Sequence, residues 1–121
     1  MSEFRIRRVN TGWKFDLLAA NGEGILSSEV YKSLAACRKG VQSVGQCAAA
    51  APVWHSLSQE PAPSNPRFEI YTDRSGSYRF RLRARNGKLI GASEPYTSKA
   101  GCLGGVESIK NCAPEALMKE E

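Results

Sequence analysis

The sequence has one histidine, no run of 18 apolar residues and no cysteine pair at metal-binding spacing. Without a long apolar run, no segment is expected to cross a membrane. Residues 1–8 alternate charged and apolar side chains and lack the apolar block of a secretory signal, so we expect a cytoplasmic protein. His55 has no second ligand near it in the sequence, and neither a metal nor another cofactor is expected.

The four cysteines, Cys37, Cys47, Cys102 and Cys112, are even in number but accompany no secretion signal. We therefore expect reduced, structural thiols, although bridges between distant parts of the chain remain geometrically possible. Cys37 and Cys102 fall on apolar helix stripes and are expected to pack in the core rather than to act as nucleophiles. No histidine lies near any cysteine in the sequence, and no catalytic constellation is found.

The charge is moderately positive: 17 Lys and Arg oppose 12 Asp and Glu, for a net charge of +5 over 121 residues. A surplus of this size makes nucleic acid or an acidic protein face a possible partner. The alternative is that the charge only maintains solubility. A hydrophobic fraction of 41% is that of a globular protein, with the length of one domain or of two small units sharing a core.

An internal duplication organises the chain. At an offset of 65, 18 of the 39 positions from 13 to 51 are identical to their counterparts, while the first strand fits an offset of 64 that aligns Phe4 with Phe68 and Ile6 with Ile70. Each copy has three stretches of alternating apolar residues followed by a stretch with helical spacing. Ser33 and Ser98 are placed to cap the helices. Asn21-Gly22 and Asn86-Gly87 predict type I′ hairpins, in which both central residues have positive φ.

These patterns predict an α+β fold: two tandem β-β-β-α repeats forming one antiparallel sheet, with two helices on one face and an approximate twofold axis. One copy is close to the lower limit for a stable core, so we expect the two to share one, giving a monomer that is an internal pseudo-dimer. The expected divisions are a first repeat at 1–51, a proline-rich, extended linker at 52–66, a second repeat at 67–116 and a frayed tail at 117–121.

The duplicated pattern resembles the YegP-like family of small uncharacterised bacterial proteins. The second copy carries the resemblance most clearly, in residues 68–71, 75–76, 78–82, 86–87, 93–94, 96, 98–99 and 107–110. The resemblance implies repeated units of three strands and a helix, with tandem members resembling a dimer built in one chain. It implies no activity and no catalytic residues. The long linker and the four cysteines depart from what the family leads us to expect.

A polar motif, Ser-Glu-x-Tyr, occurs once in each copy. It comprises Ser28, Glu29 and Tyr31, and then Ser93, Glu94 and Tyr96. Two symmetric carboxylate–phenol pairs would suit a cationic or polar ligand. The other interpretation, which we favour, is structural, because Ser and Glu side chains can satisfy the unpaired backbone groups of a strand-to-helix junction.

The second copy also has a strand dense in arginine. Arg79, Arg81, Arg83 and Arg85 alternate with apolar residues and are expected to project together, with Tyr71 and Glu69 on the neighbouring strand. Arg5, Arg7 and Lys14 are expected in similar positions in the first copy. Arginines with a nearby aromatic ring are typical of surfaces that bind single-stranded nucleic acid. The alternative is a solvated strand face. The sequence therefore indicates a non-enzymatic binding or interaction module with an unknown target, and, as the alternative, a nucleic-acid or polyanion binder.

Overall fold

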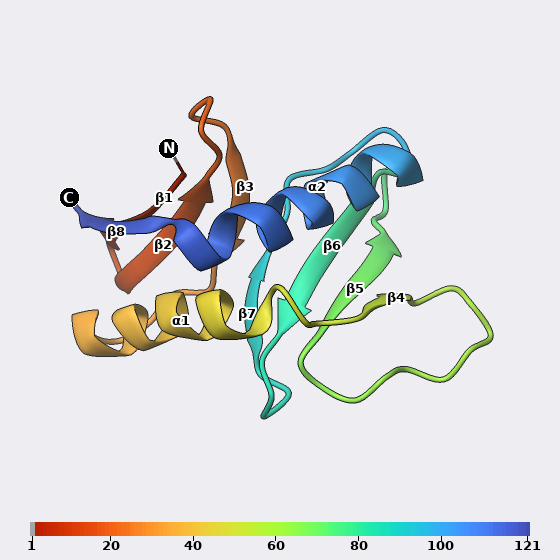
Figure 1. Cartoon of the computed structure of the whole chain (residues 1–121), viewed down its shortest axis with the longest axis horizontal. Coiled ribbons are helices and arrows are strands. Elements are labelled where there is room, and N and C mark those ends of the chain that lie inside the picture. Colours follow the sequence, from red (N-terminus) through yellow and green to blue (C-terminus); the bar gives the residue numbers. More distant parts are fainter. Residues whose placement is uncertain (1) are drawn as a thin grey trace.

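The computed structural model describes residues 2–121 and places two helices on one side of a single sheet (Figure 1). The elements follow the chain as β1 (Glu3–Val9), β2 (Gly12–Leu18), β3 (Gly24–Ser28), α1 (Leu34–Cys47), β4 (Val53–His55), β5 (Arg67–Thr72), β6 (Tyr78–Arg83), β7 (Leu89–Ala92), α2 (Lys99–Cys112), the 3-10 helix η1 (Ala113–Glu115) and β8 (Leu117–Glu120). Within the described residues, neither helix has the length and apolar character needed to cross a membrane.

The sheet has eight strands in the order β4-β5-β6-β7-β3-β2-β1-β8. Exchanging each strand for its counterpart in the other repeat reverses this order, so the pseudo-twofold axis passes between β3 and β7. There Ser27 pairs with Ala92, its own counterpart at the offset of 65. The predicted α+β fold of two repeats is confirmed. The sheet is mixed rather than purely antiparallel, because β4 and β8 pair in parallel with their neighbours.

The two parallel strands are exchanged between the repeats. β4 follows α1 of the first repeat and pairs with β5 of the second, whereas β8 follows α2 of the second repeat and pairs with β1 of the first. The two parallel pairings have the same register, because Val53 lies opposite Phe68 and its counterpart Met118 lies opposite Phe4, the counterpart of Phe68. Thus β4 lies inside the segment 52–66 expected to be a linker, and β8 forms most of the tail 117–121 expected to fray. The backbone hydrogen bonds of a parallel pairing hold both.

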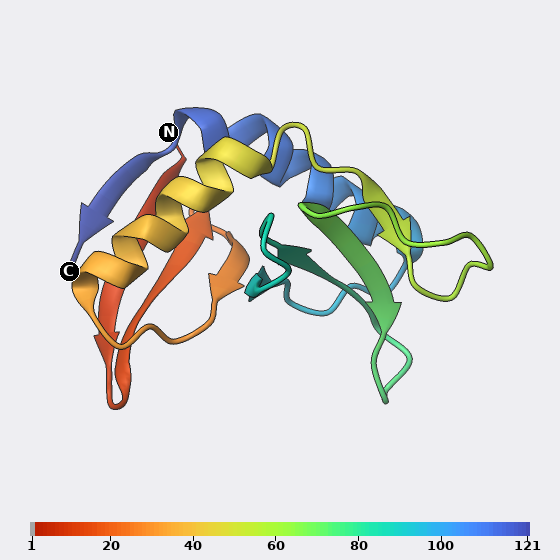
Figure 2. The ribbon, with the colours of Figure 1, turned by 90° about the horizontal axis from the view of Figure 1, so that it is seen from below.

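One hydrophobic core lies between the sheet and the helices. Strand residues alternate between this core and the opposite side, as the sequence predicts, and the phenylalanines of the first two strands in each repeat meet edge to face: Phe4 with Phe15, and Phe68 with Phe80. Seen from the side, the β1–β2 and β5–β6 hairpins extend away from the helices on either side of the central strands (Figure 2). The sheet surface that faces away from the helices is called the outer face below.

The helix caps are as predicted and the hairpin turns are not. Ser33 and Ser98 each accept a hydrogen bond at 3.0 Å from a backbone N–H in the first turn of a helix. The predicted type I′ turns are wrong, because within residues 2–121 only glycines have positive φ. Gly22 and Gly87 adopt that conformation, while Asn21 and Asn86 accept a hydrogen bond from the N–H two residues later. Each turn therefore has one left-handed residue, its glycine, and follows a shift of register between the two strands that it joins.

Candidate functional site

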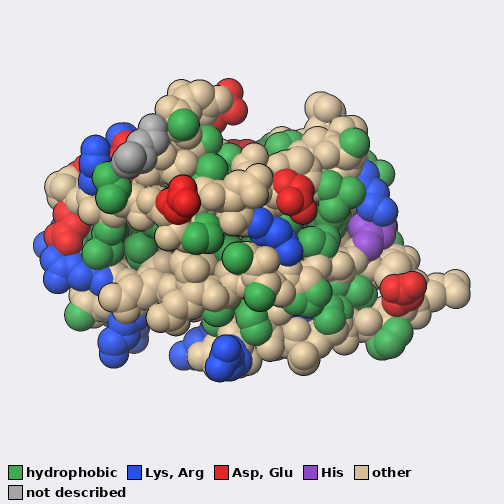
Figure 3. Space-filling model, viewed as in Figure 1, with side chains coloured by type: hydrophobic (Ala, Val, Ile, Leu, Met, Phe, Trp, Pro, Cys, Tyr) green, Lys and Arg blue, Asp and Glu red, His purple; other side chains and the backbone are tan. Residues whose placement is uncertain are grey.

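The outer face carries most of the surplus positive charge of the chain, whose net charge is +5. Eight cationic side chains of the strands lie on the outer face, because they alternate with core residues or pair across the sheet with a residue that does. They are Arg5, Arg7, Lys14, Arg67, Arg79, Arg81, Arg83 and Lys119. At least four carboxylates share this face: Glu3, Asp16, Glu69 and Glu121, whose Oε1 lies 3.7 Å from Nε of Arg5. The helix side, shown in Figure 3, has acidic and basic side chains that are scattered among one another. The charge asymmetry therefore lies across the sheet.

Glu69 is the centre of the most ordered part of this face. Only 2% of its side chain is exposed, and three guanidinium groups surround its carboxylate. Oε1 accepts from Nε of Arg81 at 2.6 Å and from Nε of Arg83 at 3.0 Å. Oε2 accepts from Nε of Arg67 at 2.7 Å, and Nη2 of the same guanidinium lies 2.7 Å from it. One buried negative charge thus holds three positive charges, and a surplus of two remains in this group, called the Glu69 cluster.

The electrostatics of the cluster keep Glu69 ionised. Burial alone would raise the pKa of this carboxyl, but the hydrogen bonds from Arg81, Arg67 and Arg83 outweigh it and lower the pKa to about 2. A buried carboxylate at neutral pH would be costly without such partners. The arginines are therefore fixed in position by the fold at any ordinary pH.

Two aromatic rings stack on arginines of the cluster. The guanidinium of Arg81 lies 4.6 Å from the ring centre of Tyr71, as the sequence led us to expect of this neighbour, and that of Arg67 lies 5.3 Å from the ring centre of Trp54. Sequence reasoning missed Trp54 and Arg67, because both were assigned to the linker or its boundary. No sequence signal identifies Trp54, because residues 53–55 and their structural counterparts 118–120 share no residue type.

The four arginines predicted to act together do not all meet. Arg81 and Arg83 share Glu69, and Arg79 lies on the same face but donates to the backbone oxygen of Ser93 at 2.9 Å. Arg85 departs from the prediction. β6 ends at Arg83 after a register shift, the alternation stops there, and Arg85 lies beside Cys47 at the end of α1, on the helix side of the sheet.

In the first repeat, the outer face is basic but less crowded. Arg7 donates to Asp16 at 2.9 Å and Arg5 to Glu3 at 3.1 Å, while Lys14 has no ion pair within the described chain. The side chains of Arg5 and Arg7 are 42% and 40% exposed, against 33% for Arg81 and 29% for Arg83. The cations of the first repeat are thus more exposed than the guanidinium groups held by Glu69 in the second.

The serines of the repeated Ser-Glu-x-Tyr motif serve the fold. Ser28 Oγ accepts from the N–H of Phe15 at 2.8 Å and donates to the carbonyl of Glu29 at 2.7 Å. Ser93 does the same with Phe80 and Glu94, at 2.9 and 2.8 Å. Each serine therefore joins the second strand to the start of the helix connection.

The tyrosines of the motif pack above helical glycines. A Cβ atom at Gly40 would collide with the phenol of Tyr31, and one at Gly105 with that of Tyr96. Glu29 and Glu94 are exposed, and no hydrogen bond or ion pair of their carboxylates occurs within residues 2–121. The serines therefore make the backbone contacts that the structural interpretation expects, whereas the glutamate side chains do not, and within residues 2–121 the carboxylates and phenols of the motif form no pair.

The cysteines are four free thiols in two environments. Cys37 and Cys102 are fully buried, and burial raises the pKa of both, to about 11 for Cys37, which disfavours the thiolate. Cys47 and Cys112 are half-buried at the helix ends. Across residues 2–121, no three His, Cys, Asp or Glu side chains gather where a metal ion would fit.

Comparison with known proteins gives the same two-repeat pattern. A family described as a domain of unknown function, DUF1508, matches residues 9–54 and again 73–120. The matched segments end within β4 and at the end of β8, so the exchanged strand belongs to the repeat. The UPF0339 protein PA0329 of Pseudomonas aeruginosa is 32% identical over 121 residues, which cover 99% of this chain and 97% of that one.

A single-repeat relative and a solved structure extend the comparison. A UPF0339 protein of Treponema denticola is 54% identical over 54 residues, which are 45% of this chain but 93% of that protein. The solution structure of yegP from E. coli, a protein of unknown function, superposes with a TM-score of 0.80 at 28% identity, covering 99% of this chain and 92% of that one. The chain thus belongs to the DUF1508 (UPF0339) family of unknown function, in its two-repeat form.

Proposed function

We propose that this protein is a non-enzymatic module that binds a nucleic-acid strand through the phosphates that contact its outer face. The observation that carries the proposal is the concentration of most of the surplus positive charge on one side of the sheet. A charge distributed evenly for solubility would not separate in this way. Phosphate contacts dominate the affinity of such complexes and require only a correctly spaced array of cations.

The Glu69 cluster makes part of that array rigid before any ligand arrives. Arg81 uses only Nε on Glu69, and its side chain is stacked on Tyr71, so both Nη groups remain for a partner. Holding a guanidinium in place through a buried carboxylate reduces the side-chain entropy lost on binding. A planar guanidinium also binds a phosphate through two parallel hydrogen bonds, which an ammonium group cannot do.

The aromatic rings favour weak sequence preference. Trp54 and Tyr71 each have a guanidinium on one side of the ring, so a nucleobase would stack on the arginine or on the opposite ring face. Stacking of this kind accepts any base. The raised pKa values of Cys37 and Cys102, and the carboxylates of Glu29 and Glu94 that stand apart from any partner, support binding rather than catalysis.

Fluorescence anisotropy of a labelled single-stranded oligonucleotide, titrated at several salt concentrations, tests the proposal. Contact with four or five phosphates gives a slope of log affinity against log salt of about −3. We expect Arg81→Lys to weaken binding several-fold at unchanged charge, because lysine cannot make the two parallel hydrogen bonds of a guanidinium to a phosphate. The matched control is Lys32→Gln with Lys39→Gln, two exposed cations near and on α1, which should leave binding nearly unchanged.

Three results would overturn the proposal. Binding that is absent at low salt, or equal loss of affinity in the control variant, would make the outer face a solvated surface. Tighter binding to an acidic protein than to the oligonucleotide, with the same dependence on Arg81, would assign the face to a protein partner instead. Circular dichroism of each variant verifies that the fold is retained.

A further inference from the structure

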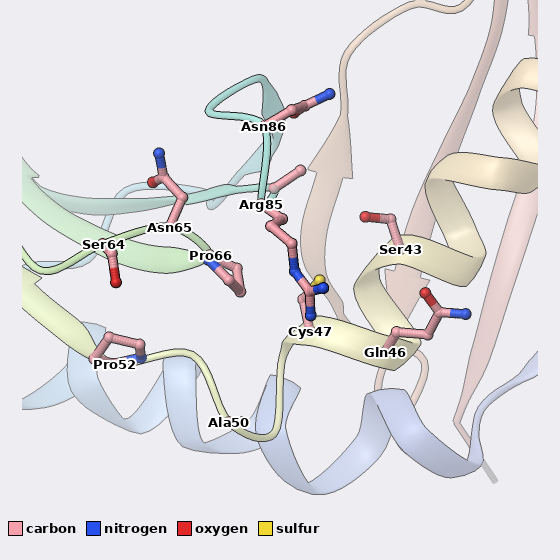
Figure 4. A pocket seen from close by; sticks show the side chains of 11 residues that line it. Ser43, Gln46, Cys47, Ala50, Pro52, Ser64, Asn65, Pro66, Arg85 and Asn86 are labelled. Carbon is pink, nitrogen blue, oxygen red and sulfur yellow. The ribbon is translucent and has the colours of Figure 1, made fainter.

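A pocket of about 570 Å³ lies on the helix side, away from the outer face (Figure 4). Its walls are the second half of α1, the segment before β5 and the turn between β6 and β7. The first repeat thus supplies the helix and the second repeat supplies the turn. A volume of this size accommodates a small metabolite.

The pocket is lined by polar groups around one positive charge. Arg85 extends into it toward Cys47, and the hydroxyl of Ser43 points into the same space (Figure 4). Gln46, Ser64 and Asn86 add amide and hydroxyl groups, and no carboxylate is among the lining residues. Arg85 has no hydrogen bond or ion pair within residues 2–121, unlike the three arginines bound to Glu69. Its side chain is exposed to solvent, so its N–H donors are accessible to a ligand.

Contacts elsewhere hold the walls in place. Arg67 donates from Nη1 to the carbonyl of Pro63 at 2.8 Å, which fixes the segment leading into β5. Lys110 of α2 donates to the carbonyl of Ala51 at 2.7 Å, just beyond α1. The two segments that line the pocket before β4 and before β5 are therefore both anchored.

The pseudo-twofold axis places a second, smaller pocket at the equivalent position. It holds about 220 Å³ and is lined by Cys112, the counterpart of Cys47, with Ala20 where the first pocket has Arg85. Glu115 lies there in place of Ala50, so the charge is reversed. The two pockets share a scaffold and have opposite chemistry, so the cation is not a requirement of the repeat.

We propose that the larger pocket binds a small hydroxylated molecule carrying one oxyanion, a phosphate or a carboxylate, which pairs with Arg85. The hydroxyl and amide groups around it bind the polar body of the ligand. Arg85 also lies near the carbonyl end of α1, which favours a cation. The proximity to this helix end accounts for the location of the Arg85 side chain, while its guanidinium N–H donors in the cavity have no protein partner within residues 2–121.

Alkylation of the half-buried thiols by iodoacetamide, followed by mass spectrometry, provides the test with a control inside the same chain. Cys47 lies in the larger pocket and Cys112 in the smaller one. We expect millimolar ribose 5-phosphate or gluconate to slow the modification of Cys47 several-fold and to leave Cys112 unaffected. Ribose, which lacks the oxyanion, should protect neither. The phosphate and the carboxylate arms show which oxyanion is preferred.

Variants connect the protection to the guanidinium. Arg85→Ala should abolish the protection of Cys47, whereas Lys88→Ala, which removes an exposed cation from the same turn, should retain it. The proposal is overturned if neither anion protects Cys47, if ribose protects equally, if Cys112 is protected to the same degree, or if Arg85→Ala changes nothing. Oligonucleotide binding by Arg85→Ala should stay near that of the wild type, because the outer face is a separate site.

Discussion

Arg81 and Glu69 face each other across β5 and β6, and the equivalent pair in the first repeat, Asp16 and Arg5, has its charges in the opposite order. A cross-strand pair of opposite charges suits this position in either order. The surroundings differ, because Arg67 and Arg83 close over Glu69 while Asp16 keeps 23% of its side chain exposed. In the first repeat Asp16 instead accepts from Arg7, and Arg5 pairs with Glu3, so the duplication kept the cross-strand position of the two charges but not their contact.

Glu69→Gln should destabilise the protein by about 3 kcal/mol, because three guanidinium groups lose the buried charge that holds them. Asp16→Asn, at the position of opposite sign, should cost less than about 1 kcal/mol, since the ion pair of Asp16 with Arg7 is partly solvated. Urea unfolding of both variants measures the difference. Equal losses would contradict the special role of Glu69.

Acid should destabilise the wild type through the same residue. The pKa of Glu69 is about 2 in the folded protein against an ordinary value of 4.5, so its stabilising effect is complete above pH 4.5. That effect is lost as the pH falls from 4.5 toward 2, because the unfolded chain takes up the proton first. Urea unfolding across this range should show a steeper decline for the wild type than for Glu69→Gln. Parallel curves would contradict the lowered pKa.

Adjacent glycines in α2 should respond in opposite directions to alanine. Gly104→Ala should stabilise the protein by up to about 1 kcal/mol, because its Cβ meets nothing within 4 Å and alanine favours the helix. Gly105→Ala should destabilise it by about 2 kcal/mol, because its Cβ would collide with the phenol of Tyr96 and approach Phe80. Thermal unfolding gives both signs, and a stabilising Gly105→Ala would refute the contact.

The thiols should separate into two classes. Native protein should react quickly with a thiol reagent at Cys47 and Cys112 and slowly at Cys37 and Cys102, where burial and raised pKa values both oppose reaction. Denaturation without reductant should expose four thiols. A lower number would mean that a disulfide had formed.

The sequence predicts those features that depend on periodicity and local chemistry. The repeat, the alternation of Phe4 and Ile6 with arginines, and the serine caps follow from spacing alone. The exchange of β4 and β8 does not, because three or four residues next to prolines have no distinctive pattern and are held by a partner far along the chain. Arg85 was placed wrongly because a shift of register in β6 ends the alternation.

Because β4 and β8 are exchanged, each repeat supplies the edge strand of the other repeat's half of the sheet. By symmetry, the gap from Glu120 to Glu3 equals the span from His55 to Arg67, which residues 56–66 bridge. A connection across either gap alone, from His55 to Arg67 or from Glu120 to Glu3, should be enough for the chain to fold. A circular permutant, joined by a copy of residues 56–66 and opened within the original loop, should keep the fold and a cooperative unfolding transition of similar midpoint. Separate chains 2–58 and 62–121 should likewise bind each other when mixed, as two halves of one sheet.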